Sequence, residues 1–134
     1  MSKILICTPS HDSKVHVDYM RGCLDLQKAF KGNPDSIDFF WQEGGSDIVK
    51  AREDILWFWY HETKHDYMLF MDSDQGFSAD TLKHLLETER GRGEACVVAA
   101  PVPLKRMKKE RLLEYVADAM TDAQAPFNRE HMFP

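Results

Sequence analysis

Short, continuous apolar runs alternate along this chain with longer segments whose apolar residues recur at helical spacing. Residues 3–8 form the first run, which is ended by Pro9-Ser10 and predicts a strand followed by a turn. Residues 17–30 come next, with apolar side chains in steps of four, three and four, which places them on one helical face: Tyr19, Cys23, Leu26 and Phe30. This first pair predicts a strand–helix unit.

The same alternation continues along the chain. Apolar runs predict further strands at Ile37–Trp41, Tyr67–Met71 and Ala95–Ala100. We expect helices from an N-cap at Ser46 to about His61, from a cap at Ser78, and over Met107–Met120. The helix after Ser46 is expected to bury Ile48, Ile55 and Trp59, and the helix after Ser78 to bury Leu82, Leu85 and Leu86. Residues 125–134 show no period and predict an irregular tail.

Four strand–helix units in strict alternation predict an α/β fold, with a mostly parallel sheet and helices on both faces. The length of 134 residues predicts a single domain. Continuous rather than alternating apolar runs are typical of strands that are covered on both faces. Because ligands bind such sheets beyond the carboxyl ends of the strands, we expect the functional residues in four loops, at residues 8–12, 42–47, 72–76 and 101–106.

The overall charge of the chain argues against some classes of partner. There are 22 acidic and 17 basic residues, which give a net charge of −5, so no nucleic-acid partner is expected. No apolar run approaches the roughly 20 residues that cross a bilayer, and no signal peptide is expected. Three separated cysteines, each among apolar residues, predict buried free thiols in a reducing compartment and therefore a cytoplasmic protein: Cys7, Cys23 and Cys96.

Two carboxylates follow the third predicted strand directly, in the sequence Asp72-Ser73-Asp74. Carboxylates one residue apart, just past a buried central strand, can converge on one divalent cation. Hard oxygen ligands suit Mg²⁺ or Mn²⁺, whose coordination is commonly completed by waters and phosphate oxygens. The alternative is that Asp72 and Asp74 only stabilise a turn, where Asp is common.

Arg52 lies four residues after Ile48 and three before Ile55, which predicts a position along the buried stripe of its helix. A buried guanidinium needs an anionic partner or an exit to a cleft. One interpretation is a salt bridge to a core carboxylate, or a side chain that extends to solvent. The other is that Arg52 faces phosphates held at Asp72 and Asp74, since a guanidinium matches phosphate oxygens well.

Several short motifs, in order, resemble the donor-binding half of GT-A glycosyltransferases, the group that includes the family 2 enzymes and their small phage and bacterial members. The resemblance covers about residues 3–106. Its motifs are Cys7-Thr8-Pro9-Ser10, Glu43-Gly44-Gly45-Ser46-Asp47, Ala51-Arg52-Glu53, Asp72-Ser73-Asp74 and the segment from Ala99 to Lys105. It implies a Rossmann-like GT-A architecture in a minimal or truncated form.

The resemblance also implies roles for individual residues. Thr8, Pro9, Ser10 and Glu43 would border the base of a UDP- or GDP-linked sugar donor. Arg52 would contact the diphosphate or the sugar, and Lys105 the diphosphate. The segment Asp72-Ser73-Asp74 would bind the ribose, with Asp72 and Asp74 as ligands of Mn²⁺ or Mg²⁺.

Two departures from the family pattern bear on the function. Glu53 stands where the family usually has Asn, and the chain stops where the family adds its acceptor-binding half. That half usually supplies the catalytic base, and no equivalent base is identifiable here. The sequence therefore predicts either a metal-dependent glycosyltransferase with an unidentified acceptor, or a nucleotide-sugar-binding module of the same fold with little activity.

A further motif, His61-Glu62-Thr63-Lys64-His65, matches the HExxH pattern of zinc peptidases. A zinc hydrolase using His61, Glu62 and His65 is thus a third hypothesis. By helical rotation, however, both histidines should point away from the buried stripe, which predicts a solvated helix end. The neighbouring Trp57 and Phe58 flank the inner stripe and could form a contact in a homo-oligomer.

Overall fold

A computed structural model of the protein describes residues 1–94 and 96–100. Along these residues the elements are β1 (Lys3–Ser10), α1 (Val17–Phe30), β2 (Ser36–Glu43), α2 (Ile48–Glu62), β3 (Tyr67–Phe70) and α3 (Ala79–Arg92). The α/β class is confirmed, and α1 has the bounds that its spacing predicts. Met1–His84 form one compact unit that holds all the described strands, and a second unit begins at Leu85.

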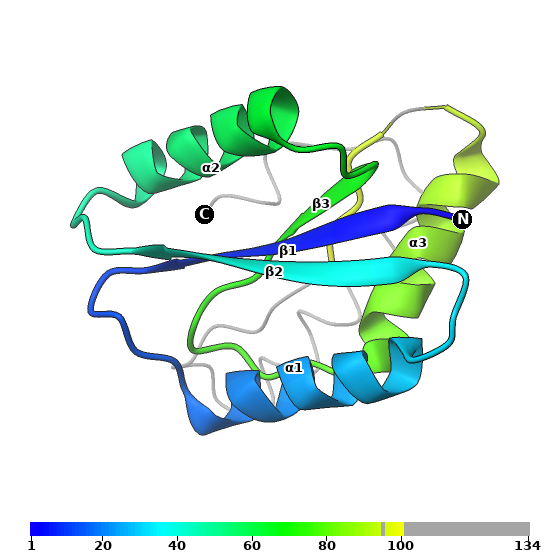
Figure 1. The fold of residues 1–134 in the computed structure, drawn as a ribbon, viewed down its shortest axis with the longest axis horizontal. Helices are drawn as coiled ribbons and strands as arrows, with labels where there is room; N and C mark the ends of the chain where they lie inside the picture. The colour runs from blue at the N-terminus through cyan, green and yellow to red at the C-terminus, as the bar shows by residue number, and fades with distance from the viewer. Residues whose placement is uncertain (95, 101–134) are drawn as a thin grey trace, which may run out of the picture. The chain divides into compact units, whose positions relative to one another are not determined.

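The described strands form one parallel sheet in the order β2-β1-β3 (Figure 1). β1 pairs with β2 along its whole length, from Lys3 opposite Ser36 to Ser10 opposite Glu43. It pairs with β3 from Ile4 opposite Tyr67 onward. The predicted parallel sheet is confirmed, but its centre is β1. The expectation that Tyr67–Met71 is a central strand is wrong for the described sheet, in which β3 lies at an edge.

The two crossover helices cover opposite faces of the sheet, as predicted (Figure 1). On one face, Leu5 and Cys7 of β1 pack with the buried Ile55 of α2. Partly buried side chains complete this layer: Phe40, Phe58, Trp59 and Met68. Since side chains alternate along a strand, Ile4, Ile6 and Thr8 face the other layer, which α1 covers.

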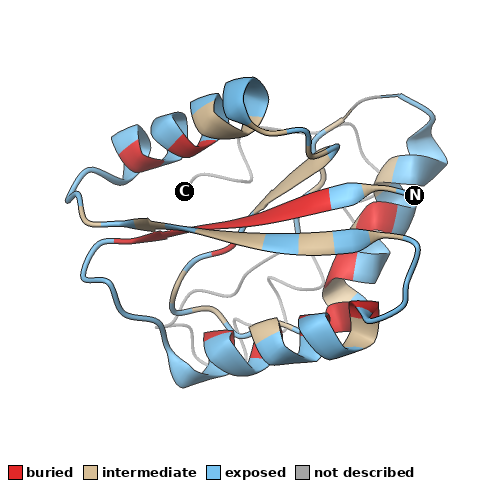
Figure 2. Ribbon diagram, viewed as in Figure 1, coloured by how far each residue is buried: buried red, intermediate tan, exposed pale blue. Residues whose placement is uncertain are grey.

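β1 is buried from Ile4 to Ser10 without interruption (Figure 2). This agrees with its continuous apolar sequence, because a strand covered by helices on both faces has no solvated side. Against its α1 side lie the fully buried Tyr19 and Leu26. Gly22 of α1 lies so close to Phe77 that an added Cβ would stand 2.8 Å from the Phe77 ring. Tight packing of α1 therefore fixes the segment between β3 and α3.

Helix starts differ in detail from the predictions. The N-cap of α2 is Asp47, not Ser46: its carboxylate accepts from the backbone N–H groups of Val49 and Lys50 at 3.0 and 3.1 Å. At the start of α3, the backbone N–H of Ala79 donates to Asp25 of α1 at 2.9 Å. Ser78 contributes its carbonyl, which accepts from Thr81. Asp carboxylates thus accept from two backbone donors at the start of α2 and from one at the start of α3.

The predicted inner face of α2 is partly wrong. Ile55 is fully buried, but Ile48 is 50% exposed, and Ala51 takes the buried place one turn before Ile55. Trp59 is half-buried. Of the pair suggested as an oligomer contact, Trp57 is exposed, whereas Phe58 stacks on Phe40 with ring centroids 4.5 Å apart. Phe58 therefore belongs to the interior.

The fourth predicted strand, Ala95–Ala100, is wrong for its described part, because residues 96–100 form no strand. The predicted helix Met107–Met120, the tail 125–134 and Lys105 lie outside the described residues. Within the described ranges, none of the helices has the length and apolar character that crossing a membrane requires. The cysteines are free thiols as predicted, but only Cys7 is buried, while Cys23 and Cys96 are partly exposed.

Candidate functional site at the carboxyl edge of the sheet

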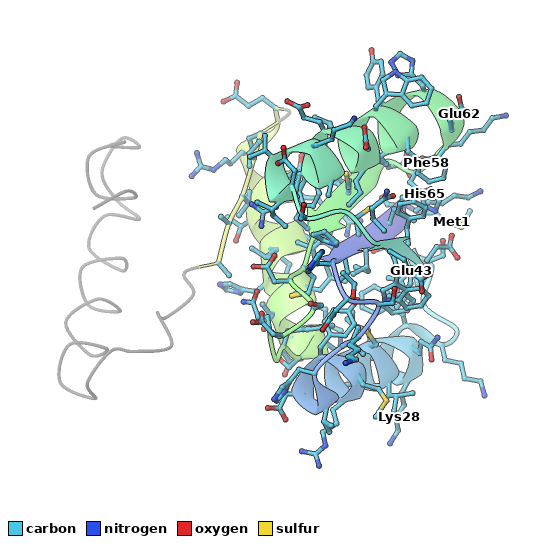
Figure 3. All side chains as sticks on the ribbon, turned by 90° about the vertical axis from the view of Figure 1, so that its left-hand side faces the viewer. Met1, Lys28, Glu43, Phe58, Glu62 and His65 are labelled. Atoms are coloured by element: carbon cyan, nitrogen blue, oxygen red, sulfur yellow. The ribbon has the colours of Figure 1, made fainter. Side chains whose placement is uncertain are left out.

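The loops that follow β1, β2 and β3 meet at one edge of the sheet. The backbone N–H of Gly44 donates to the Ser10 carbonyl at 3.0 Å, and that of His16 donates to the Ser73 carbonyl at 2.8 Å. Figure 3 looks along the sheet, with α2 above, the strands between and α1 below. The chain leaves β1 through α1 on one face and reaches β3 through α2 on the other. In open parallel sheets, ligands bind beyond the carboxyl ends of neighbouring strands whose connections run over opposite faces, and here these strands are β1 and β3.

Arg52 and Asp72 are brought together at this edge from different elements. Arg52 Nη2 donates to Asp72 Oδ1 over 3.1 Å, from the first turns of α2 to the residue two places after β3. The two side chains are 47% and 52% exposed. The guanidinium carbon also lies 5.8 Å from the centroid of the Phe70 ring, in a cation–π arrangement. An exposed helix residue and a post-strand carboxylate thus form one polar cluster.

The predicted position of Arg52 on the buried stripe of α2 is wrong, because the neighbouring Ala51 occupies the inner face. Arg52 lies beside that face and is exposed. The predicted alternative of a bridge to a core carboxylate is also wrong, since Asp72 is itself exposed. The structure does place Arg52 close to the acidic motif, through its contact with Asp72.

The acidic motif forms a tight turn. The backbone N–H of Gln75 donates to the Asp72 carbonyl at 3.2 Å, and Asp72 and Asp74 are both exposed at the edge of the sheet. Between them, Ser73 is half-buried and its carbonyl holds the loop after β1. The backbone therefore makes the turn, and the residues that carry the two carboxylates are exposed.

The segment Thr8-Pro9-Ser10 is buried. Thr8 is 0% exposed and its hydroxyl lies 2.6 Å from the hydroxyl of Tyr19. Ser10 is 3% exposed and donates through Oγ to the Lys14 carbonyl at 2.8 Å. Both side chains pack in this structure rather than face a crevice. The nucleotide contacts predicted for this segment stay predictions.

Glu43 is exposed and borders two hollows on either side of the end of β2. One, of about 190 Å³, is mostly apolar and lies against α1, where Tyr19, Met20 and Trp41 contribute to its wall. The other, of about 240 Å³, is more polar and is formed by residues 42–47 with Lys50, Ala51 and Asp54. Gly44 and Gly45 turn the chain between the two hollows with φ of 75° and 80°, a backbone conformation that residues other than glycine rarely adopt.

The sequence analysis assigns no polar contact to two further residues near this edge, His11 and Tyr19. His11 Nδ1 lies 2.8 Å from the Gly45 carbonyl and joins the loops after β1 and β2. Tyr19, expected only as an apolar residue of α1, also accepts a hydrogen bond from Trp41 Nε1 at 3.0 Å. The position of His11 within the predicted loop at residues 8–12 is the signal that could have indicated it. The turn predicted at Pro9-Ser10 is wrong, because both residues belong to β1 and pair with Gln42 and Glu43.

Burial keeps the nucleophilic groups under this edge neutral. It raises the pKa of the Cys7 thiol from 9.0 to about 12, and desolvation is also the main cause that raises the pKa of Tyr19 from 10.0 to about 12. The pKa of Cys23 is raised as well, chiefly by burial. A thiol is nucleophilic as the thiolate, so neither Cys7 nor Cys23 is suited to covalent catalysis near neutral pH.

The HExxH motif does not have the geometry that a shared zinc ion needs. α2 ends at Glu62, so His61 and His65 are not one turn apart on a helix. His61 is exposed, and His65 is only 16% exposed with Nε2 2.8 Å from Asp38 Oδ2. The expectation that both histidines are solvated is wrong for His65, which joins the loop before β3 to β2.

Within residues 1–94 and 96–100, no group of three or more His, Cys, Asp or Glu side chains is arranged to hold a metal ion. The pair Asp72 and Asp74 falls below that number, but Mg²⁺ commonly takes one or two protein carboxylates together with waters and phosphate oxygens. The donor set therefore suits a cation that arrives with a phosphorylated ligand. Comparisons of this chain with protein-family models, with curated proteins and with solved structures find no match.

Proposed function

We propose that the chain binds a nucleoside-diphosphate sugar and is the donor-binding part of a metal-dependent GT-A glycosyltransferase. The observation that supports this most is the contact between Arg52 and Asp72 over 3.1 Å at the carboxyl edge of a parallel sheet. The contact supports the proposal because a guanidinium can bind phosphate, a carboxylate can bind a metal ion, and parallel sheets bind ligands at this edge. A Rossmann-like α/β arrangement of strands and helices is consistent with the proposal.

Arg52 can hold Asp72 and a phosphate at the same time. A guanidinium has five N–H donors in a planar fork, and among the described residues Arg52 donates one hydrogen bond, from Nη2 to Asp72. Because Arg52 is about half exposed, its remaining donors can reach a diphosphate without any rearrangement of α2. The pair would then orient the Asp72 carboxylate as well as bind the ligand.

Asp72 and Asp74 would hold Mn²⁺ or Mg²⁺ together with the diphosphate oxygens. The metal, when bound, neutralises charge on the diphosphate as it leaves the sugar. Arg52 adds a fixed positive charge at the same group, which stabilises developing negative charge. The protein's part in sugar transfer is therefore to bind and to stabilise the leaving group, with the acceptor unidentified.

Ligand-induced stabilisation tests the proposal. The melting temperature of the full chain would be measured with UDP and with GDP, each with and without MnCl₂. A ligand that binds only the folded state raises this temperature by mass action. We expect one nucleotide to stabilise the chain in a metal-dependent way, and Asp74→Asn and Arg52→Gln each to remove most of the shift.

Matched controls lie near the far end of α2, away from the carboxyl edge. Glu62→Gln and Lys64→Gln change the same kinds of charge at exposed positions and should keep the nucleotide shift. Equal shifts in all four variants, or no shift with either nucleotide, would overturn the proposal. If the shift is found, release or transfer of sugar from UDP- and GDP-linked donors distinguishes an enzyme from a binding module of the same fold.

A further inference from the structure

The outer edge of β2 is an eight-residue strand edge that pairs with no strand among the residues that the structure describes. Figure 1 shows β2 in front of β1, with α1 and α2 on either side of the sheet. Exposed edges of sheets are usually protected by charged side chains, most often lysine, by proline or by a bulge. The sequence of β2, Ser-Ile-Asp-Phe-Phe-Trp-Gln-Glu, has no proline and no lysine, and the register of β2 with β1 is unbroken.

The backbone groups that face outward can be assigned from the hydrogen bonds at the two ends of β2. The N–H groups of Ser36 and Gly44 donate to Ser2 and Ser10, on the β1 side. Since the direction alternates along a strand, the even-numbered N–H groups face β1. The odd-numbered groups, at Ile37, Phe39, Trp41 and Glu43, face outward and pair with no strand within residues 1–94 and 96–100.

An apolar surface lies beside this edge on the α1 side. Trp41 is 48% exposed, stacks on Phe39 and is held in place by its hydrogen bond to Tyr19. Met20 and Leu24 of α1 are 48% and 58% exposed. The hollow of about 190 Å³ lies between Trp41 and Met20 and can receive an aliphatic side chain.

The charge of the edge indicates what kind of strand it accepts. From Gly32 to Asp47 the chain has no Lys or Arg, and β2 itself has two carboxylates, Asp38 and Glu43. Asp38 is 65% exposed on the face that α2 covers, opposite the face of Trp41, and one of its carboxylate oxygens lies 2.8 Å from His65 Nε2. A second copy of β2 would bring like charges together, which is unfavourable across strands. A basic strand is favoured.

We propose that the β2 edge binds an extended segment of another protein in which cationic and apolar residues alternate. The segment adds a strand to the sheet through the outward N–H and C=O groups of β2. Its apolar residues pack on Trp41, Met20 and Leu24, and its cationic residues face Asp38 on the other side. This inference is independent of the proposed sugar-donor site.

Backbone N-methylation provides the sharpest test. The probe is a fluorescently labelled eight-residue peptide of alternating Lys and Val, measured by anisotropy against the full chain. Two isomers are compared, one N-methylated on every Lys and one on every Val. Each isomer lacks the donors of one strand edge only, so binding by strand addition should weaken one of them by about tenfold or more relative to the other.

Protein variants test the same surface. Ile37→Pro removes one outward donor without loss of a bond to β1 and should weaken binding, as should Asp38→Asn, whereas Glu62→Gln should not. Equal binding of the two methylated isomers would show attachment by charge alone and overturn the proposal. So would the absence of peptide binding, or a concentration-dependent dimer of the chain that Ile37→Pro abolishes.

Discussion

The hydroxyl of Tyr19 lies 2.6 Å from the hydroxyl of Thr8, and both side chains are fully buried between α1 and β1. The Tyr19 oxygen also accepts from Trp41, so three elements share one buried polar atom. Buried groups that lose a hydrogen-bond partner keep the cost of desolvation without compensation.

Removal of this hydroxyl should therefore destabilise the fold. Tyr19→Phe leaves Thr8 and Trp41 without their partner, and we expect the free energy of unfolding to fall by about 1–3 kcal/mol. Urea denaturation measures the change. Tyr60→Phe, at a side chain that is 73% exposed, is the control and should cost little. Equal effects of both substitutions would contradict the interpretation.

The close approach of α1 to Phe77 predicts that Gly22 tolerates no side chain. An added Cβ would stand 2.8 Å from the Phe77 ring and 2.9 Å from its carbonyl oxygen. Gly22→Ala should lower the free energy of unfolding by about 1–3 kcal/mol through overpacking. Gly91→Ala meets no atom within 4 Å in helix α3 and should be neutral or stabilising by about 1 kcal/mol at most.

The cap of α2 gives a matched pair of substitutions in adjacent residues. Asp47→Ala removes the acceptor of two backbone N–H groups and should cost about 0.5–2 kcal/mol of stability. Ser46→Ala should cost much less. Denaturant midpoints of the two variants, compared with that of the parent chain, decide which residue caps the helix. A larger loss of stability in Ser46→Ala than in Asp47→Ala would identify Ser46 as the cap.

Alkaline pH should weaken the fold through Cys7. Its pKa is about 12 when folded against 9.0 ordinarily, so above pH 9 the unfolded chain binds fewer protons than the folded chain. The free energy of unfolding therefore falls as the pH rises from about 9 toward 12. Cys7→Ala removes this contribution and should give a shallower dependence in urea titrations at successive pH values. An unchanged slope would contradict the assignment.

The Arg52–Asp72 contact should contribute little to stability. Both side chains are about half exposed, and exposed pairs contribute about 1 kcal/mol or less. Arg52→Gln is thus expected to shift the urea midpoint only slightly. This small effect separates a loss of nucleotide binding from a loss of fold, and a large destabilisation would indicate a structural role instead.

Sequence alone predicts the elements that have one clear buried face, such as α1, or that are buried on both faces, such as β1. The continuous run of β1 and the spacing in α1 leave one way to bury each of them. α2 is ambiguous, because Ala51 and Ile55 are one turn apart and form a buried row as well as Ile48 and Ile55 do. Because the side chain of Ala51 is small, it contributes little to the hydrophobic pattern of α2. The pattern therefore predicts the wrong inner face, and with it a buried position for Arg52.

The strand predicted at Ala95–Ala100 shows a different limit. A strand exists only when it is paired, and an apolar run does not identify its partner; Val97 is 98% exposed and its neighbours pair with no strand. His65 shows a third limit of prediction from sequence, because its contact with Asp38 depends on where α2 ends. At the candidate site, the acidic turn follows from local sequence, but the contact of Arg52 with Asp72 depends on the path of the chain between them.

The central position of β1 has a consequence for how the protein opens. Its amides are bonded to a strand on each side, and its residues from Ile4 to Ser10 are buried. Amide protons of Ile4 through Cys7 can meet solvent deuterium only when the whole unit comes apart, so their exchange rates report global stability. The outward amides of β2 need no such event and should exchange first. Within one sheet, the amides of β2 would then report local opening and those of β1 global unfolding.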